Sequence, residues 1–150
     1  MINKKGFTLI EIIMVLALAG IVMSVVMSFF IANYKSYETI NAESEVQYQS
    51  QYIINYMTNK ILEAKSYDES ANEFEYVDGS FASFEKYDEK IKYTYGTTTD
   101  KESVYIGNYV DNLKIETNGT NEVRITLVLL KNGSVPYPAE QVVYMRNSQN

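Results

Sequence analysis

An apolar run near the N-terminus limits what this chain can fold into more than any other feature. The run covers residues 6–32, reads GFTLIEIIMVLALAGIVMSVVMSFFIA, and follows the basic pair Lys4 and Lys5. No charged residue occurs from Ile12 to Tyr34. Because about twenty helical residues, at 1.5 Å each, span the ~30 Å hydrocarbon core of a bilayer, the run predicts a membrane-spanning helix.

Glu11 is the exception within this run. A carboxylate that enters lipid costs about 2–4 kcal/mol even on the mild insertion scales, so its presence needs a reason. A secretory signal peptide cut near Ala17-Leu18-Ala19 would hold Glu11 in its apolar core and would leave an apolar new N-terminus. An ordinary signal anchor explains the length of the run and the basic flank, and it also leaves Glu11 unexplained.

The hexapeptide GFTLIE (residues 6–11), together with the apolar run behind it, resembles the class III signal of type IV prepilins and pseudopilins. The resemblance implies that a membrane-embedded prepilin peptidase cuts after Gly6 and methylates the new amino group of Phe7. It further implies that Glu11 stays in the mature subunit and pairs with the N-terminal amine of an adjacent subunit.

Elementary physical chemistry agrees with these implied roles. Glycine at the scissile position leaves the backbone open to a protease, and the lysines hold the leader (residues 1–6) on the cytoplasmic side. Glu11 would lie in the first turns of the mature helix, where the helix dipole favours an anion. A buried charge pair of this kind favours the correct register between neighbouring subunits more than it adds stability.

Composition limits the function of the remainder. With the first thirty or so of 150 residues in the anchor, there is room for one small domain. The net charge is −6, and loss of Lys4 and Lys5 with the leader leaves 11 basic against 19 acidic residues, or −8, which argues against general nucleic-acid binding. The absence of histidine and cysteine removes the usual nucleophile–base pairs and most transition-metal sites. We therefore expect no enzyme, no cofactor and no metal site.

A second helical pattern follows the apolar run. Residues 33–65 contain no proline and no glycine. Mostly apolar residues recur there at steps of three, four and seven, which places them in one stripe along a helix. Its members are Val46, Ser50, Ile53, Met57, Ile61 and Ala64. The pattern predicts one continuous helix from Phe7 to roughly Lys65, about 90 Å long, with a membrane and assembly half (7–32) and an amphipathic half (33–65).

Residues 66–150 predict a β-sheet head. Acidic residues crowd the part up to residue 89 without the spacing of a calcium loop, so we predict a solvated acidic connection with a short strand near Phe74–Val77 rather than a calcium site. Further strands are predicted at 90–95, 103–106, 112–117, 122–130 and 141–146. Asn118-Gly119 predicts a hairpin turn, and both prolines fall in a predicted loop over 134–140.

The predicted fold class is therefore α+β, with a long N-terminal helix packed on a small antiparallel sheet. The sheet would cover the stripe of the helix with one apolar face. That face would comprise Leu113, Ile115, Val123, Ile125, Leu127, Leu129, Val143 and Met145.

Two further features bear on the kind of subunit. Many major pilins carry a proline farther along this helix, whereas position 28 here is Ser28. Three short motifs in the C-terminal part resemble minor pilins and pseudopilins of the J/W kind. They are Tyr109 through Lys114-Ile115, then Arg124-Ile125-Thr126-Leu127, and finally residues 142–147, VVYMRN. The resemblance thus favours a minor subunit over a major one.

Together these features predict a structural subunit, a minor pilin that initiates a type IV pilus-like filament or lies at its tip. The implied partners are other pilin subunits, the prepilin peptidase, a platform membrane protein and an assembly ATPase. The chain would cross the inner or cytoplasmic membrane once and then join an extracellular filament at the cell surface. Two alternatives stay open: a pseudopilin of a type II secretion or DNA-uptake machine, and a signal-anchored surface adhesin or receptor that never polymerises.

Overall fold

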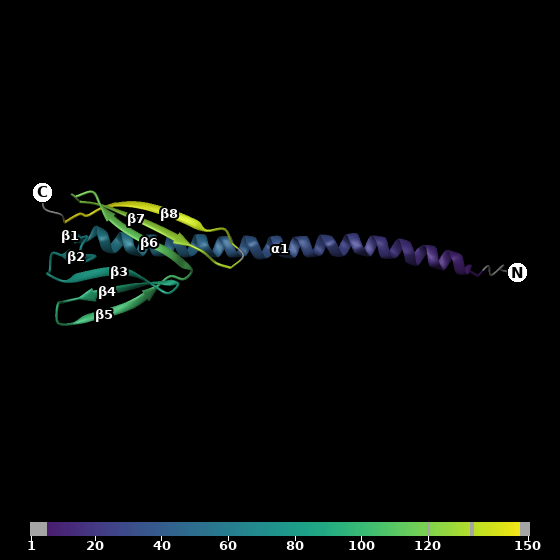
Figure 1. Cartoon of the computed structure of the whole chain (residues 1–150), viewed down its shortest axis with the longest axis horizontal. Helices are drawn as coiled ribbons and strands as arrows, with labels where there is room; N and C mark the ends of the chain where they lie inside the picture. Colours follow the sequence, from purple (N-terminus) through teal and green to yellow (C-terminus); the bar gives the residue numbers. More distant parts are fainter. Residues whose placement is uncertain (1–5, 120, 133, 148–150) are drawn as a thin grey trace. The chain divides into compact units, whose positions relative to one another are not determined.

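The computed structural model describes residues 6–119, 121–132 and 134–147, which form one long helix and eight strands (Figure 1). The chain divides into two compact units, residues 1–39 (the N-terminal unit) and residues 40–150 (the globular unit). Of the predicted leader, only Gly6 lies within the described residues.

The helix α1 runs from Leu9 to Leu62. It begins and ends within a few residues of the predicted bounds, Phe7 and Lys65. Every described side chain of the N-terminal unit is exposed, and α1 is long and apolar enough there to cross a membrane. The predicted stripe is buried in the globular unit, where Ile53, Met57 and Ile61 are each 0% exposed.

The strands form two antiparallel sheets in which neighbours along the chain pair with each other. The first sheet has the order β1-β2-β3-β4-β5, and the second has the order β6-β7-β8. Their bounds are β1 Ala64–Asp68, β2 Glu73–Tyr76, β3 Phe81–Tyr87, β4 Lys90–Gly96, β5 Lys101–Ile106, β6 Val110–Thr117, β7 Glu122–Leu129 and β8 Tyr137–Tyr144.

One hydrophobic core joins both sheets to the end of α1. The first sheet contributes Phe74, Phe84 and Ile91, and rings from neighbouring strands touch, as in the stacked pair Phe84 and Tyr93 with centroids 4.8 Å apart. In the second sheet, the predicted inward residues of β7 and the segment around β8 are buried, while Leu113 and Ile115 of β6 are partly buried. The α+β class is confirmed.

The prediction of a solvated acidic connection over residues 66–89 is wrong beyond its one short strand. Only β2 was expected there, yet this part of the chain also contains most of β1 and all of β3. Within β2 the acids alternate with apolar or aromatic residues, so that Glu73 and Glu75 flank the buried Phe74 and bond to polar partners. High acidity concealed a period-2 pattern.

The last strand also differs from the prediction. It begins at Tyr137, and Pro138 pairs opposite Val128 within it instead of lying in a loop. β8 is an edge strand, where a residue without an N–H is tolerated. The hairpin at Asn118-Gly119 is confirmed, because β6 and β7 pair across it and Gly119 has a φ of 82°. Gly133 and Thr120 lie outside the described residues.

Candidate functional site

The first turn of α1 is organised by Thr8. The backbone N–H of Ile12 donates to the Thr8 carbonyl at 3.3 Å, and the N–H of Glu11 donates to the Thr8 hydroxyl oxygen at 3.4 Å. Thr8 is therefore the N-cap of the helix, and Glu11 occupies the third helical position. Threonine followed three residues later by glutamate is the capping-box pattern, a signal present in the sequence from which a helix start at Thr8 could have been predicted.

Glu11 is exposed, and it lies among apolar side chains. Together with Phe7, Ile12, Val15 and Leu16 it lines a shallow hollow on the N-terminal unit. A carboxylate in the first turn is favoured by the free N–H groups of the helix end. In a lipid environment such a carboxylate requires a cationic partner, and an ammonium group from another chain has the right chemistry.

Gly6 lies just before the helix and is exposed. A Cβ built on Gly6 would find no described atom within 4 Å. The described part of this chain thus gives no steric reason for glycine at position 6. If glycine is required at position 6, we expect the reason to lie in the protein that binds this segment, namely the peptidase of the predicted cleavage between Gly6 and Phe7.

Polar side chains along α1 in the N-terminal unit bond to their own helix. Ser24 Oγ donates to the Ile21 carbonyl at 2.7 Å, and Ser28 Oγ donates to the Ser24 carbonyl at 2.8 Å. The hydroxyl groups of Ser36 and Thr39 do the same toward carbonyls four residues earlier. Hydrogen bonding of this kind lets hydroxyl groups enter an apolar medium without a lost partner.

Comparison with protein families agrees with this geometry. The family model of the prokaryotic N-terminal methylation motif matches residues 1–27, which include Gly6, Phe7 and Glu11. The match and the long apolar helix support a type IV pilin-like protein that a prepilin peptidase processes and that a membrane anchors. No curated protein and no solved structure is significantly similar to the chain.

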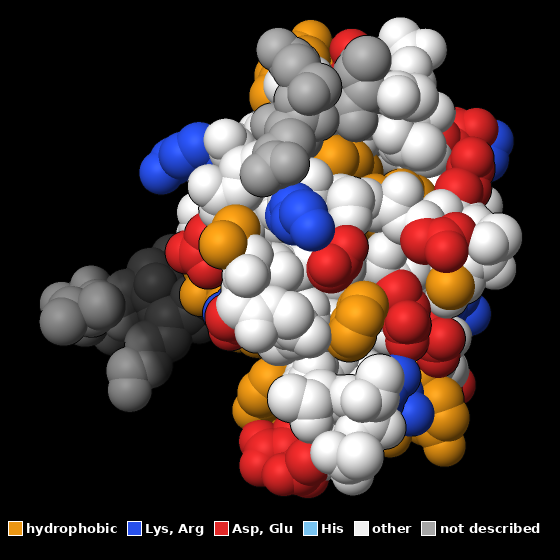
Figure 2. Space-filling model, turned by 90° about the vertical axis from the view of Figure 1, so that its left-hand side faces the viewer, with side chains coloured by type: hydrophobic (Ala, Val, Ile, Leu, Met, Phe, Trp, Pro, Cys, Tyr) orange, Lys and Arg blue, Asp and Glu red, His pale blue; other side chains and the backbone are white. Residues whose placement is uncertain are grey.

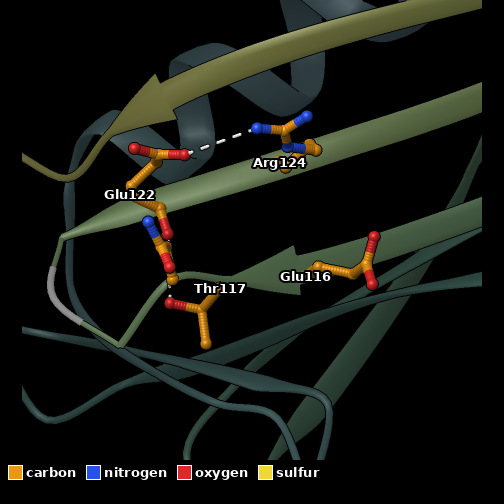
Figure 3. Close-up of a pocket in the computed structure, with 5 residues that line it drawn as sticks. Glu116, Thr117, Glu122 and Arg124 are labelled. Atoms are coloured by element: carbon orange, nitrogen blue, oxygen red, sulfur yellow. Dashed lines mark hydrogen bonds and ion pairs between the residues drawn. The ribbon is translucent and has the colours of Figure 1, made fainter.

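The globular unit carries a polar hollow where β6 ends and β7 begins (Figure 3). Its arginine, Arg124, bonds to Glu140 at 2.7 Å across the sheet and lies 3.8 Å from Glu122, while Glu116 bonds to Lys114 at 2.7 Å. These charges satisfy one another on a solvent-exposed sheet face. We therefore do not assign chemistry to this hollow.

A contact between distant segments fixes α1 within the globular unit. Glu45 accepts a hydrogen bond from the Tyr109 hydroxyl at 2.9 Å and forms an ion pair with Lys131, whose ammonium lies 5.1 Å from the centre of the Tyr109 ring. The Lys131 bond, followed by the Tyr109 bond, lowers the pKa of Glu45, and the Glu45 bond raises the pKa of Lys131. We call these three residues the Glu45 clamp.

Sequence reasoning missed this clamp, because Tyr109 and Lys131 lie 64 and 86 positions from Glu45 and no local pattern links them.

The acidic residues that crowd the chain before residue 89 do not gather into one cluster. Asp68 and Asp78 accept hydrogen bonds from Ser70 and Ser80 in their own turns, and the described residues contain no group of three possible metal ligands. Figure 2 shows acidic side chains spread over one face of this unit, with single apolar side chains between them.

Proposed function

We propose that this chain is a minor subunit of a type IV pilus-like filament, at its tip or in its initiation complex. The observation that carries the proposal is the N-terminal methylation motif over residues 1–27, continued by a helix whose apolar side chains are all exposed within the N-terminal unit. A helix of that kind needs lipid or other helices around it. In this proposal, cleavage follows Gly6, Phe7 is methylated, and the chain leaves the membrane for a surface filament.

The choice of a minor subunit rests on two features. At Ser28, where many major pilins carry proline, α1 continues and the hydroxyl bonds to the Ser24 carbonyl. The J/W-like residues lie in β6, β7 and β8 and in the segments next to them.

Because the exchange of helix–lipid contact for helix–helix contact gains little free energy, extraction of the helix from the membrane requires a platform protein and an assembly ATPase. The role is structural and not enzymatic.

Deletion of this chain, with a count of surface filaments, tests the minor role. We expect filaments to be lost or much rarer, and re-expression to restore them while this chain remains a trace component of purified shafts. A shaft composed mainly of this chain would contradict the proposal. Normal filaments with a defect in protein secretion or DNA uptake would favour the pseudopilin alternative, which the same motif supports.

Glu11→Ala separates filament assembly from simple anchoring. A signal-anchored adhesin or receptor should keep its membrane level and its surface exposure after this change. A filament subunit should remain in the membrane and fail to enter filaments, because the neighbouring amine loses its carboxylate. Glu38→Ala is the matched control, since Glu38 is also an exposed glutamate of α1. Equal incorporation of both variants would reject polymerisation through Glu11.

A further inference from the structure

The outer edge of β5 is a regular strand edge of the globular unit. β5 lies at one end of the five-stranded sheet and pairs only with β4 among the described strands (Figure 1). Its first five residues, Lys101 to Tyr105, are all exposed. A strand edge presents a row of backbone N–H and C=O groups that can pair with another chain.

The other three sheet edges each carry a feature that hinders such pairing. β1 and β6 contain register shifts next to Ala64 and Val110, and the N–H of Val110 also bonds to the Glu89 carbonyl at 2.9 Å. β8 contains Pro138, which has no N–H to donate. Bulges and proline are the means by which proteins protect sheet edges.

β5 lacks both features. Its register with β4 is regular over six residue pairs, and it has no proline. Its two charged residues are exposed and bond to residues of the same sheet: Lys101 to Glu73 at 2.8 Å, and Glu102 accepts from the Tyr95 hydroxyl at 2.7 Å. The remaining four residues of β5, Ser103 to Ile106, are uncharged.

Apolar side chains flank this edge on both faces of the sheet. Val104 is opposite Tyr93, on the face that packs against α1, and it is 43% exposed. Tyr105 points to the other face, where its ring lies 5.3 Å from that of Tyr87, and it is 52% exposed. A strand added beside β5 would cover both side chains and bond to the free backbone.

We propose that β5 binds an extended segment of another polypeptide, which adds antiparallel to it as a sixth strand. Only a polypeptide backbone offers alternating donors and acceptors at the required spacing, which selects this class of partner. β4 already shows which side chains suit β5, with Tyr93 beside Val104 and Thr94 beside Ser103, whose hydroxyls lie 3.0 Å apart. The partner segment should place an apolar residue beside Val104 on the face of α1 and, on the other face, a polar residue beside Ser103 and an apolar or aromatic one beside Tyr105. This surface belongs to the globular unit, so its test does not depend on filament formation.

A labelled synthetic peptide with the sequence of β4, Lys90–Gly96, is the probe, and its binding to the full chain in detergent is measured by fluorescence anisotropy. Two versions are compared, with backbone N-methyl groups at Ile91, Tyr93 and Tyr95 or at Lys92 and Thr94. Alternate residues of a strand point their N–H groups to opposite sides, so one version should bind and the other should not. Equal affinity of the two versions, or no binding of the unmodified peptide, would overturn the proposal.

Val104→Lys supplies the matching change in the protein. An inward-facing lysine on an edge strand opposes pairing, and we expect about tenfold weaker peptide binding or more. Val77→Lys is the control, because Val77 follows β2 in the same sheet and is 70% exposed. Both variants should keep the far-UV circular dichroism of the parent chain. Equal loss of binding in the two variants would also overturn the proposal.

Discussion

At position 6 the described structure has room for a larger side chain than glycine. Any requirement for glycine there must therefore come from a second protein that binds this segment. Gly6→Val should leave the fold unchanged, since no described atom lies near a Cβ at this position. It should block cleavage, because a branched side chain crowds the scissile backbone. The measurement is the intact mass of the chain recovered from its native membrane, which should retain residues 1–6 and lack the methyl group.

Gly20→Ala is the control for this change. Position 20 lies within α1, and no described side chain or distant backbone atom lies within 4 Å of a Cβ there. This variant should be cut and methylated as the parent chain is, with a chain that begins at Phe7. Normal cleavage of Gly6→Val would mean that the peptidase does not read position 6 and that the predicted role of Gly6 is wrong.

Gly107 shows the opposite situation, in which the fold itself requires glycine. It follows β5, has a φ of 67°, and a Cβ there would overlap the Cδ1 and Cγ1 atoms of the buried Ile53. Gly107→Ala should destabilise the globular unit by about 2–5 kcal/mol, from left-handed strain and overpacking together. Urea unfolding followed by circular dichroism measures the loss.

Gly79→Ala separates those two causes. Gly79 has a φ of 80°, and no described atom lies within 4 Å of its Cβ position. Its substitution should cost only the backbone strain, about 1–2 kcal/mol. If Gly107→Ala proved no worse than Gly79→Ala, the close packing of Ile53 on this turn would be disproved.

At the scale of elements, the Glu45 clamp links α1 to the segments after β5 and β7. The pKa of Glu45 lies below its ordinary value of 4.5, so its stabilising contribution is complete above that pH and is lost as the pH falls through the lower folded value. The pKa of Lys131 is raised above 10.5, so its contribution is complete below that pH and is lost as the pH rises through the folded value.

Glu45→Gln should therefore lower the thermal midpoint of the globular unit near neutral pH, and the difference from the parent chain should shrink as the pH falls through the lowered pKa of Glu45. Circular dichroism melts over this range provide the measurement. Glu116→Gln is the control, since Glu116 pairs with Lys114, whose side chain is 62% exposed, and such surface pairs contribute little. A difference that persists at low pH would show that Glu45 acts through packing and not through its charge.

The strands that the sequence predicted well are those with turn residues at their ends. β4 and β7 match their expected bounds to within one residue. The Asn118-Gly119 turn explains why the hairpin of β6 and β7 was predicted. β3, whose burial alternates from Phe81 to Phe84, was missed because it lies in a stretch rich in acidic residues. β1 was missed because it follows α1 closely and its burial does not alternate. The split into two sheets could not be predicted either, since a strand's alternation does not say which strand lies beside it.

At the scale of the whole molecule, the N-terminal motif and the globular unit were predictable to different degrees. Gly6, Phe7 and Glu11 form one short segment, so a local pattern is enough to single them out. The Glu45 clamp and the open edge of β5 arise only when distant segments meet. Contacts of that kind depend on the register and the order of strands, which composition and periodicity leave undetermined.

The globular unit should fold independently of the N-terminal unit. The buried residues of α1 begin at Ala42 and continue with Val46 and Ser50, so the described core contains no residue before position 40. A fragment of residues 40–150 should fold without detergent and melt cooperatively within about 5 °C of the globular unit in the full chain, since few contacts are lost. A fragment of residues 55–150 is the control: it removes Val46 and Ile53 from the core and should not melt cooperatively. Failure of the longer fragment to fold would mean that the N-terminal unit is needed to stabilise the rest of the chain.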